Sequence, residues 1–226
     1  EVLVYAWLMP ASTVLQAVIG GITVRTGLLW WTVAVHLLVS MVMVWLATLL
    51  FIKVGEPDDG VVTEVVPNPL RWLTFTSGLA LAATLFTGSL VTGAGPHAGD
   101  KSPQRVVPRL EIEVVTLVHA HVTVLVCFLS LLVGLGAGLR AVAAPPPVIK
   151  RLAVLVGLVI VQGLIGEIQY HTGVPPVLVA MHVAGATACT AATAALWASM
   201  RQRAARPGAT VGDLPGERAE APALQR

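Results

Sequence analysis

Charged and aromatic side chains are scarce in this chain of 226 residues. Only 12% of the residues are charged and 5% are aromatic, whereas 56% are hydrophobic. A soluble globular domain carries about 25% charged residues. The scarcity of charge therefore excludes a soluble domain and predicts a polytopic membrane protein. The net charge of +2 gives no support for a nucleic-acid partner.

Cysteine is scarce as well. The two cysteines, Cys127 and Cys189, fall inside apolar runs, where we expect small packing residues rather than a disulfide. No CxxC, CxxCH, Walker or GxGxxG pattern occurs, so covalently attached haem and nucleotide binding have no support. No basic segment precedes the first apolar run, so that run does not have the form of a cleavable signal peptide.

Long apolar runs are what the sequence has instead. Crossing a hydrocarbon core of about 30 Å takes about 20 residues in a helix. Six runs are long enough, over residues 3–24, 29–52, 72–93, 113–139, 152–170 and 176–200. We therefore predict an all-α integral membrane protein in which six transmembrane helices are seen.

Basic residues gather at one set of span ends. These residues are Lys53, Arg71, Arg140, Lys150, Arg151, Arg201, Arg203 and Arg206. The excess of positive charge predicts that this end faces the cytoplasm. We expect a multi-pass protein of the cell membrane with a cytoplasmic linker over 53–71 and a cytoplasmic C-terminus. The segment 201–226 is rich in Ala, Pro, Arg and Glu, a composition that predicts a disordered tail.

Two stretches of the chain are similar to one another. Residues 16–36 and 162–182 align without a gap, and nine of the 21 positions are identical. Each copy is an apolar helix end, a Thr-Gly turn and a second apolar run that carries a histidine. The internal repeat predicts two similar four-helix halves and eight helices in all. Residues 1–52 would be the last two helices of the N-terminal half, and residues 72–200 the whole C-terminal half, so we expect two more helices before residue 1.

Histidines within spans are the candidate functional residues, because an ionisable side chain in lipid is costly. His36 and His182 each lie nine residues after a turn glycine, and His119 lies eleven residues after Pro108. At about 1.5 Å per residue all three reach a similar depth. Two imidazoles at one level of a helical bundle can hold a haem iron, so we predict His119 and His182 as a ligand pair. His121 points about 200° away from His119 on the same helix, and the choice between the two stays open.

His36 then becomes a ligand in a second haem pocket whose other histidine lies outside this sequence. Cations at the outer ends of the spans are candidate partners for haem propionates, since arginine pairs with carboxylates in a bidentate way. They are Arg25, Arg105 and Arg109; the competing interpretation is ordinary loop charge. Zinc is disfavoured, because a set of four ligands does not converge here.

At these residues the chain resembles the haem A synthase family. The matching segments are LQAVIGGITVRTGL with the following His36, TGSLVTGAGPHAGD at 87–100, LVHAH around His119, and VQGLIGEIQYHTGVP with the following His182. The resemblance covers roughly residues 10–200.

The resemblance implies an eight-span oxidoreductase that oxidises a methyl group of haem O to a formyl group, making haem A for cytochrome oxidase. It implies haem b between His119 and His182, and a substrate-haem side to which His36 belongs. Haem O synthase and cytochrome oxidase assembly factors are the partners it suggests. The catalytic acid and the partner of His36 are expected on the two further helices, so no catalytic residue is assigned.

Two other function classes fit part of the pattern. A non-catalytic membrane cytochrome b, acting as an electron-transfer subunit, explains the histidines equally well but not the family-like loop at 87–100. A transporter with histidine proton relays is the third. Inverted repeats are common in transporters, whereas the spacing of four spans keeps both copies here in the same orientation.

Overall fold

The computed structural model describes residues 2–57, 60–100 and 106–204. Six long helices dominate it: α1 (Val2–Arg25), α2 (Trp30–Val54), α3 (Asn68–Ala94), α4 (Val114–Ala141), α5 (Pro146–His171) and α6 (Pro176–Ala198). All six are long and apolar enough to cross a membrane. The prediction of an all-α protein with six helices able to span a membrane is therefore confirmed for the described residues. Each helix covers its predicted apolar run to within two residues.

Proline and glycine set the ends of these helices. α3, α5 and α6 each have proline in the first turn, where the missing N–H costs nothing because no intrahelical partner exists there. The two short turns, α1 to α2 and α5 to α6, share one backbone conformation. Gly27 and Leu28 have φ of 72° and 58°, and Gly173 and Val174 have φ of 77° and 59°. Leucine and valine rarely adopt positive φ, so the same strained turn recurs in both places.

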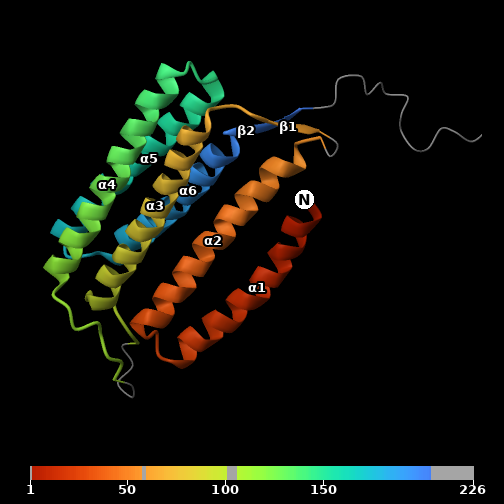
Figure 1. Ribbon diagram of the computed structural model, residues 1–226. Coiled ribbons are helices and arrows are strands. Elements are labelled where there is room, and N and C mark those ends of the chain that lie inside the picture. The colour runs from red at the N-terminus through yellow and green to blue at the C-terminus, as the bar shows by residue number, and fades with distance from the viewer. Residues whose placement is uncertain (1, 58–59, 101–105, 205–226) are drawn as a thin grey trace, which may run out of the picture.

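Helices α3 to α6 form a four-helix unit. Each packs against two neighbours in the ring α3, α4, α5, α6 and back to α3. The backbones of α4 and α6 do not approach each other, so these two helices occupy diagonal positions in the unit. α2 packs against α3 and α6, and among the described elements α1 packs against α2 alone. Figure 1 shows α1 at the margin of the bundle, beyond α2.

The two ends of the bundle differ. We call the end with the α1–α2 turn, the α3–α4 loop and the α5–α6 turn the turn end. At the opposite end, the strand end, β1 (Val61–Glu64) pairs antiparallel with β2 (Arg201–Ala204), so that Glu64 lies beside Arg201. Residues 201–204 were predicted as the start of a disordered tail. They form a strand because the linker supplies an unpaired partner strand, and residues 205–226 lie outside the described part of the chain.

The linker prediction over 53–71 also needs correction. α3 begins at Asn68, and Arg71 is buried in its first turn. Arg71 is bonded to the carboxylate of Glu64 and lies over the ring of Trp197. Burial of a charged side chain is tolerated only when it is paired, and β1 supplies that pair. The predicted linker is thus a structured connection to the four-helix unit.

The hydrophobic core occupies the strand-end half of the four-helix unit. Its fully buried side chains on α4 are Phe128, Leu132, Leu135 and Leu139, and those on α5, α6 and beyond include Leu155, Leu196 and Met200. Toward the turn end the inward positions change character, because glycine, serine, threonine, glutamine and histidine replace the large apolar residues. The unit is therefore tightly packed at one end, while small and polar residues line the other.

Candidate functional site

Three histidines in the turn-end half share one local arrangement. In each, the imidazole lies against a glycine on the preceding helix. A Cβ added to Gly20 would lie 3.2 Å from Cε1 of His36, and a Cβ on Gly166 would lie 3.2 Å from Cε1 of His182. These approaches are tighter than ordinary side-chain packing, so a larger residue in place of either glycine would require the ring to shift by a few tenths of an ångström.

The third such contact is between α3 and α4, and it involves His121. A Cβ on Gly88 would lie 3.0 Å from Cε1 and 3.3 Å from Nδ1 of His121. We call these three contacts the glycine–histidine contacts. They were not predicted from sequence. The signal that could have found them is a glycine on the preceding helix at a distance from the turn similar to that of the histidine.

The structure favours His121 over His119 as the histidine that faces the inside of the unit. His121 is half-buried against α3, whereas His119 is exposed on the surface of α4. Two residues along a helix rotate the side chain by about 200°, so the two rings cannot face the same way. Depth alone led to the preference for His119, and depth does not distinguish residues so close along one helix.

His121 and His182 lie at matching levels on diagonal helices. His121 is seven residues from the start of α4 and His182 is six residues from the start of α6, which is about 10 Å and 9 Å along the axis. Because the backbones of α4 and α6 do not approach each other, any group held by both rings would lie in the interior of the four-helix unit.

The helix that carries His182 is tied to α5 by a glutamine. Nε2 of Gln162 donates to the backbone carbonyl of His182 at 2.6 Å. The equivalent bond in the first hairpin runs from Nε2 of Gln16 to the carbonyl of His36 at 3.2 Å. Each glutamine lies four residues before the glycine of the contact. These bonds fix the level of each histidine relative to the glycine that it faces.

The ring nitrogens of the three histidines differ in their partners. Nδ1 of His121 lies 3.0 Å from the carbonyl oxygen of Thr84 and 3.1 Å from Oγ1 of Thr87. Nδ1 of His36 and Nδ1 of His182 are buried, and neither has a hydrogen-bond partner among the described residues. A buried polar atom without a partner costs about 1–3 kcal/mol. His36 and His182 therefore each have a buried ring nitrogen that forms no hydrogen bond with the described residues.

The loop after α3 joins the two turns at the turn end. Nε2 of His97 donates to the carbonyl of Val174 at 2.7 Å, and the backbone N–H of Asp100 donates to the carbonyl of Gly27 at 2.8 Å. The same loop was predicted as a family-like segment. Its contacts hold the α1–α2 and α5–α6 turns at one level.

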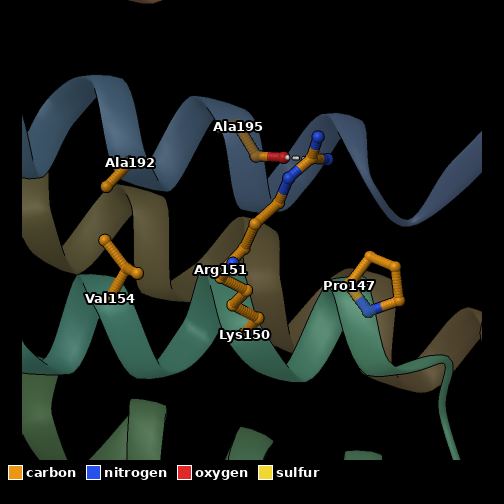
Figure 2. A pocket seen from close by; sticks show the side chains of 6 residues that line it. All are labelled: Pro147, Lys150, Arg151, Val154, Ala192 and Ala195. Atoms are coloured by element: carbon orange, nitrogen blue, oxygen red, sulfur yellow. Dashed lines mark hydrogen bonds between the residues drawn. The ribbon is translucent and has the colours of Figure 1, made fainter.

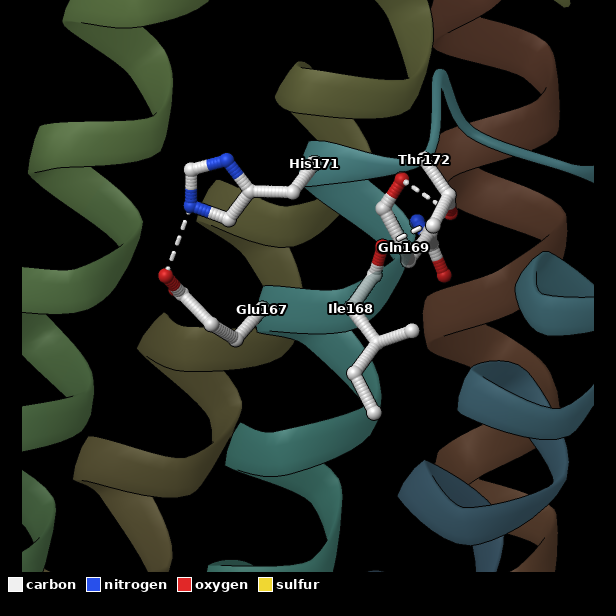
Figure 3. Close-up of polar contacts among 5 residues, drawn as sticks. All are labelled: Glu167, Ile168, Gln169, His171 and Thr172. Atoms are coloured by element: carbon white, nitrogen blue, oxygen red, sulfur yellow. Dashed lines mark hydrogen bonds and ion pairs between the residues drawn. The ribbon is translucent and has the colours of Figure 1, made fainter.

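A carboxylate and an imidazole pair on the exposed surface of the last turns of α5. Oε1 of Glu167 and Nε2 of His171 are 2.8 Å apart, and both side chains are about two-thirds exposed. Figure 3 shows both pointing away from α5 on the same side. The Thr172 hydroxyl donates to the carbonyl of Ile168 at 2.7 Å, which ends the helix. The pair is a surface feature one turn from the site.

The predicted propionate partners lie at the turn end where they are described. Arg25 ends α1 and Arg109 precedes α4, and both are exposed. Arg105 lies outside the described residues. The two described arginines lie at the same end of the bundle as His121 and His182.

The strand end carries a shallow pocket of about 330 Å³ between α5 and α6. Pro147, Lys150, Arg151, Val154, Ala192 and Ala195 line it. Arg151 reaches across to donate to the carbonyl of Ala195 at 3.1 Å, as Figure 2 shows. The pocket lies beyond the hydrophobic core from the histidines, so it is separate from the site.

The donor set limits which metals the site can hold. Within the described part of the chain, His, Cys, Asp and Glu form no group of three or more that could bind an ion. Cys189 is buried and Cys127 is exposed, and both are free thiols. Two imidazoles from different helices of a bundle can ligate a metal whose other ligands come from a macrocycle.

Comparisons with known proteins add no relative: no family model, no curated protein and no solved structure matches this chain.

Proposed function

We propose that the chain binds haem between His121 and His182 and that it is a membrane oxidoreductase of the haem A synthase type. The observation that carries the proposal is the pair of imidazoles at one level on the diagonal helices α4 and α6. Helical bundles build cofactor sites from side chains on facing helices, and two axial histidines are a common ligand set for haem iron.

The residues around the pair fit such a group. Gly88 and Gly166 allow the rings of His121 and His182 to lie close against α3 and α5. Neither ring therefore has to project far into the interior of the unit. The inward positions toward the turn end are small or polar, while the large apolar core stops at the strand-end half.

With water as the oxygen source, oxidation of the methyl group of haem O, the proposed substrate, to a formyl group releases four electrons and four protons, and haem bound here would pass those electrons one at a time to an external electron acceptor. The protein's part is to hold the ligands and to set the surroundings of the iron. His121 and His182 supply the two axial nitrogens. Gln162 fixes the level of His182 by donating to the backbone carbonyl of His182. The hydrophobic core excludes water from the strand-end side of the site. Arg25, Arg105 and Arg109 are the proposed partners of the propionates at the turn end.

The test is to record optical absorption and electron paramagnetic resonance spectra of the protein purified from cells that supply haem. We expect a low-spin spectrum with two histidine ligands, and its loss in His121→Ala and in His182→Ala. His119→Ala is the matched control on the same helix and should keep the spectrum. A normal spectrum in both His121→Ala and His182→Ala would reject the ligand pair, and loss in His119→Ala alone would restore His119.

Activity is tested separately, in cells that make haem O and lack their own haem A synthase. Haem A in the pigment extract supports the enzyme. Bound haem b without haem A supports the alternative, a non-catalytic membrane cytochrome b that transfers electrons for a partner subunit. The observation that favours the alternative concerns His36, which lies on α2. Of the helices that pack against α2, α1 and α3 contain no histidine, and the histidine of α6 is His182, the proposed partner of His121.

We also propose that α1 and α2 belong to a second four-helix half, which makes eight helices in the whole protein. The support is the recurrence of the glycine–histidine contact, the glutamine bond and the turn conformation in α1–α2 and α5–α6. His36 would then be a ligand of the substrate haem. The coding sequence upstream of residue 1 tests this, since it should encode two apolar spans with a histidine and an acid.

The proposed location is the cell membrane with the strand end in the cytoplasm. The described basic residues at the strand end outnumber those at the turn end, as the positive-inside rule requires. A cysteine introduced at Arg109 should react with a membrane-impermeant reagent in intact cells, and one at Lys150 should not. The opposite labelling pattern would invert the orientation.

A further inference from the structure

We propose that α3 fixes His121 in one tautomer, with the proton on Nδ1, so that His121 is a preset ligand while His182 is an adaptable one. The inference deepens the proposed function and rests on it only for the identity of the metal group. The fixing residues are Thr84, Thr87 and Gly88, which we call the α3 notch. They lie within one and a half turns of one helix.

The carbonyl of Thr84 decides where the proton lies. A carbonyl oxygen can only accept a hydrogen bond, and it lies 3.0 Å from Nδ1 of His121. Nδ1 must therefore carry the hydrogen. In a neutral imidazole the other nitrogen then has the free lone pair, so Nε2 of His121 is the metal-binding atom before any metal arrives.

The hydroxyl of Thr87 supports the same arrangement. Its hydrogen is directed to backbone carbonyls of its own helix, at 3.0 Å from both Ala83 and Thr84. Its oxygen is left to accept from Nδ1 of His121 at 3.1 Å. Two acceptors on one face of the ring restrict its rotation as well as its tautomer. A second partner of this kind orients a ligating histidine and raises its basicity.

Gly88 brings the ring within reach of these acceptors. A Cβ at this position would meet both Cε1 and Nδ1 of His121, so any larger residue would push the ring away from Thr84 and Thr87. The glycine thus acts as a positioning residue, since it does not touch the metal site itself.

His182 has the same glycine contact but no such partners. Its Nδ1 is buried without a hydrogen bond among the described residues. The position four residues before the glycine is threonine in α3 and glutamine in α5, and the glutamine bonds to the backbone of His182 rather than to its ring. Nothing in the described contacts selects one tautomer of His182. The two ligands therefore differ in how far the protein prepares them.

The first test needs no haem. In haem-free protein labelled with ¹⁵N in its histidine rings, we expect His121 to show a protonated Nδ1 and an unprotonated Nε2, assigned by the loss of its signals in His121→Gln. Gly88→Ala should convert this signal to a mixture of tautomers. Gly78→Ala, on the same helix with only ordinary contacts to Trp45, is the matched control and should change nothing.

Thr87 is tested by shape-conserving variants in the same experiment. Thr87→Val should broaden the His121 signals, and Thr87→Ser should restore them. Thr92→Val is the control, because the Thr92 hydroxyl bonds to the carbonyl of Gly88 and to no histidine. Proton on Nε2 of His121 in the unmutated protein would overturn the inference, even if Gly88→Ala or Thr87→Val failed to fold.

Haem titration gives the second readout. Removing an outer partner of a metal-bound histidine lowers affinity by about 10-fold to 100-fold, so we expect at least a tenfold weaker haem affinity in Thr87→Val and no change in Thr92→Val. Equal affinities in both variants would overturn the inference. A protein that binds no haem at all but keeps the Nδ1 proton on His121 would reject the proposed function and leave the tautomer assignment standing.

Discussion

The hairpins α1–α2 and α5–α6 contain the same local unit in different surroundings. Both have a glutamine bonded to the backbone of a histidine, a glycine under the ring, and a turn with two residues at positive φ. α5 and α6 complete a ring with α3 and α4, whereas α1 contacts α2 alone among the described helices. The comparison teaches that the hairpin sequence places a histidine, but the neighbouring helices decide whether a second histidine opposes it.

The largest expected difference between the hairpins is in haem content. His182→Ala should abolish the low-spin spectrum of the haem held with His121, because one axial ligand is lost. His36→Ala should leave that spectrum intact, because His36 belongs to the other hairpin. The haem-to-protein ratio and the absorption spectrum of the two purified variants measure this. Equal loss in both variants would mean that the hairpins share a single site.

The glycine contacts should separate the hairpins next. Gly166→Ala forces the ring of His182 to move by a few tenths of an ångström, and we expect haem affinity to fall about tenfold, a typical cost for disturbing the positioning of a ligand. Gly20→Ala makes the same contact with His36 and should leave that affinity unchanged. Both are measured by haem titration of the haem-free protein.

Gly163→Ala is the control for that pair. It lies on α5, and a Cβ there would meet nothing within 4 Å. Alanine is favoured over glycine in a helix by about 1 kcal/mol, so this variant should be slightly more stable and bind haem normally. Weaker haem binding in Gly163→Ala would show that any alanine on α5 disturbs the site.

The glutamine bonds should contribute to stability in both hairpins, with the larger effect in α5–α6. Gln162→Leu removes a bond of 2.6 Å to the carbonyl of His182, and we expect the free energy of unfolding to fall by about 1 kcal/mol. Gln16→Leu removes a longer bond to the carbonyl of His36 and a bond to the Ser40 hydroxyl. Both bonds lie in a half-buried position on a helix with one described neighbour, so we expect this variant to cost less. Unfolding in detergent mixtures, followed by circular dichroism, measures both. A larger loss in Gln16→Leu would contradict this order.

The smallest effect should come from Glu167, the one acidic residue that is present in only one copy of the repeat. Glu167 replaces the glycine found at position 21, and its ion pair with His171 is exposed. Exposed pairs contribute about 0.2–1 kcal/mol at most, so Glu167→Gln should change neither haem content nor the unfolding midpoint beyond error. A clear loss of haem in Glu167→Gln would give this pair a role at the site.

The spans were predictable because hydrophobic length fixes them. Each helix covers its predicted run to within two residues. The largest discrepancies are at the proline-rich starts of α3 and α5, which begin at Asn68 and Pro146, before the predicted starts. Depth along a helix was also predictable, since it follows from counting residues from a turn. These features depend on one segment at a time.

The choice between His119 and His121 was not predictable in the same way. It depends on which face of α4 meets α3, and that face is set by Gly88 and the carbonyl of Thr84. The strands were missed for a similar reason. Neither four-residue segment has a strong pattern of its own, and each is a strand only because residues 137 or more positions away pair with it.

The pairing of β1 with β2 has a consequence for how the chain is made. β2 follows the last helix, so β1 leaves the ribosome long before its partner exists. Until α6 has been inserted, the carbonyls and N–H groups of residues 61–64 have no partner strand, and Arg71 has only its local partners Glu64 and Asn68, because Trp197 has not yet been made. Closing contacts of such long sequence separation is slow. The strand pair can therefore form only after the whole four-helix unit has been synthesised.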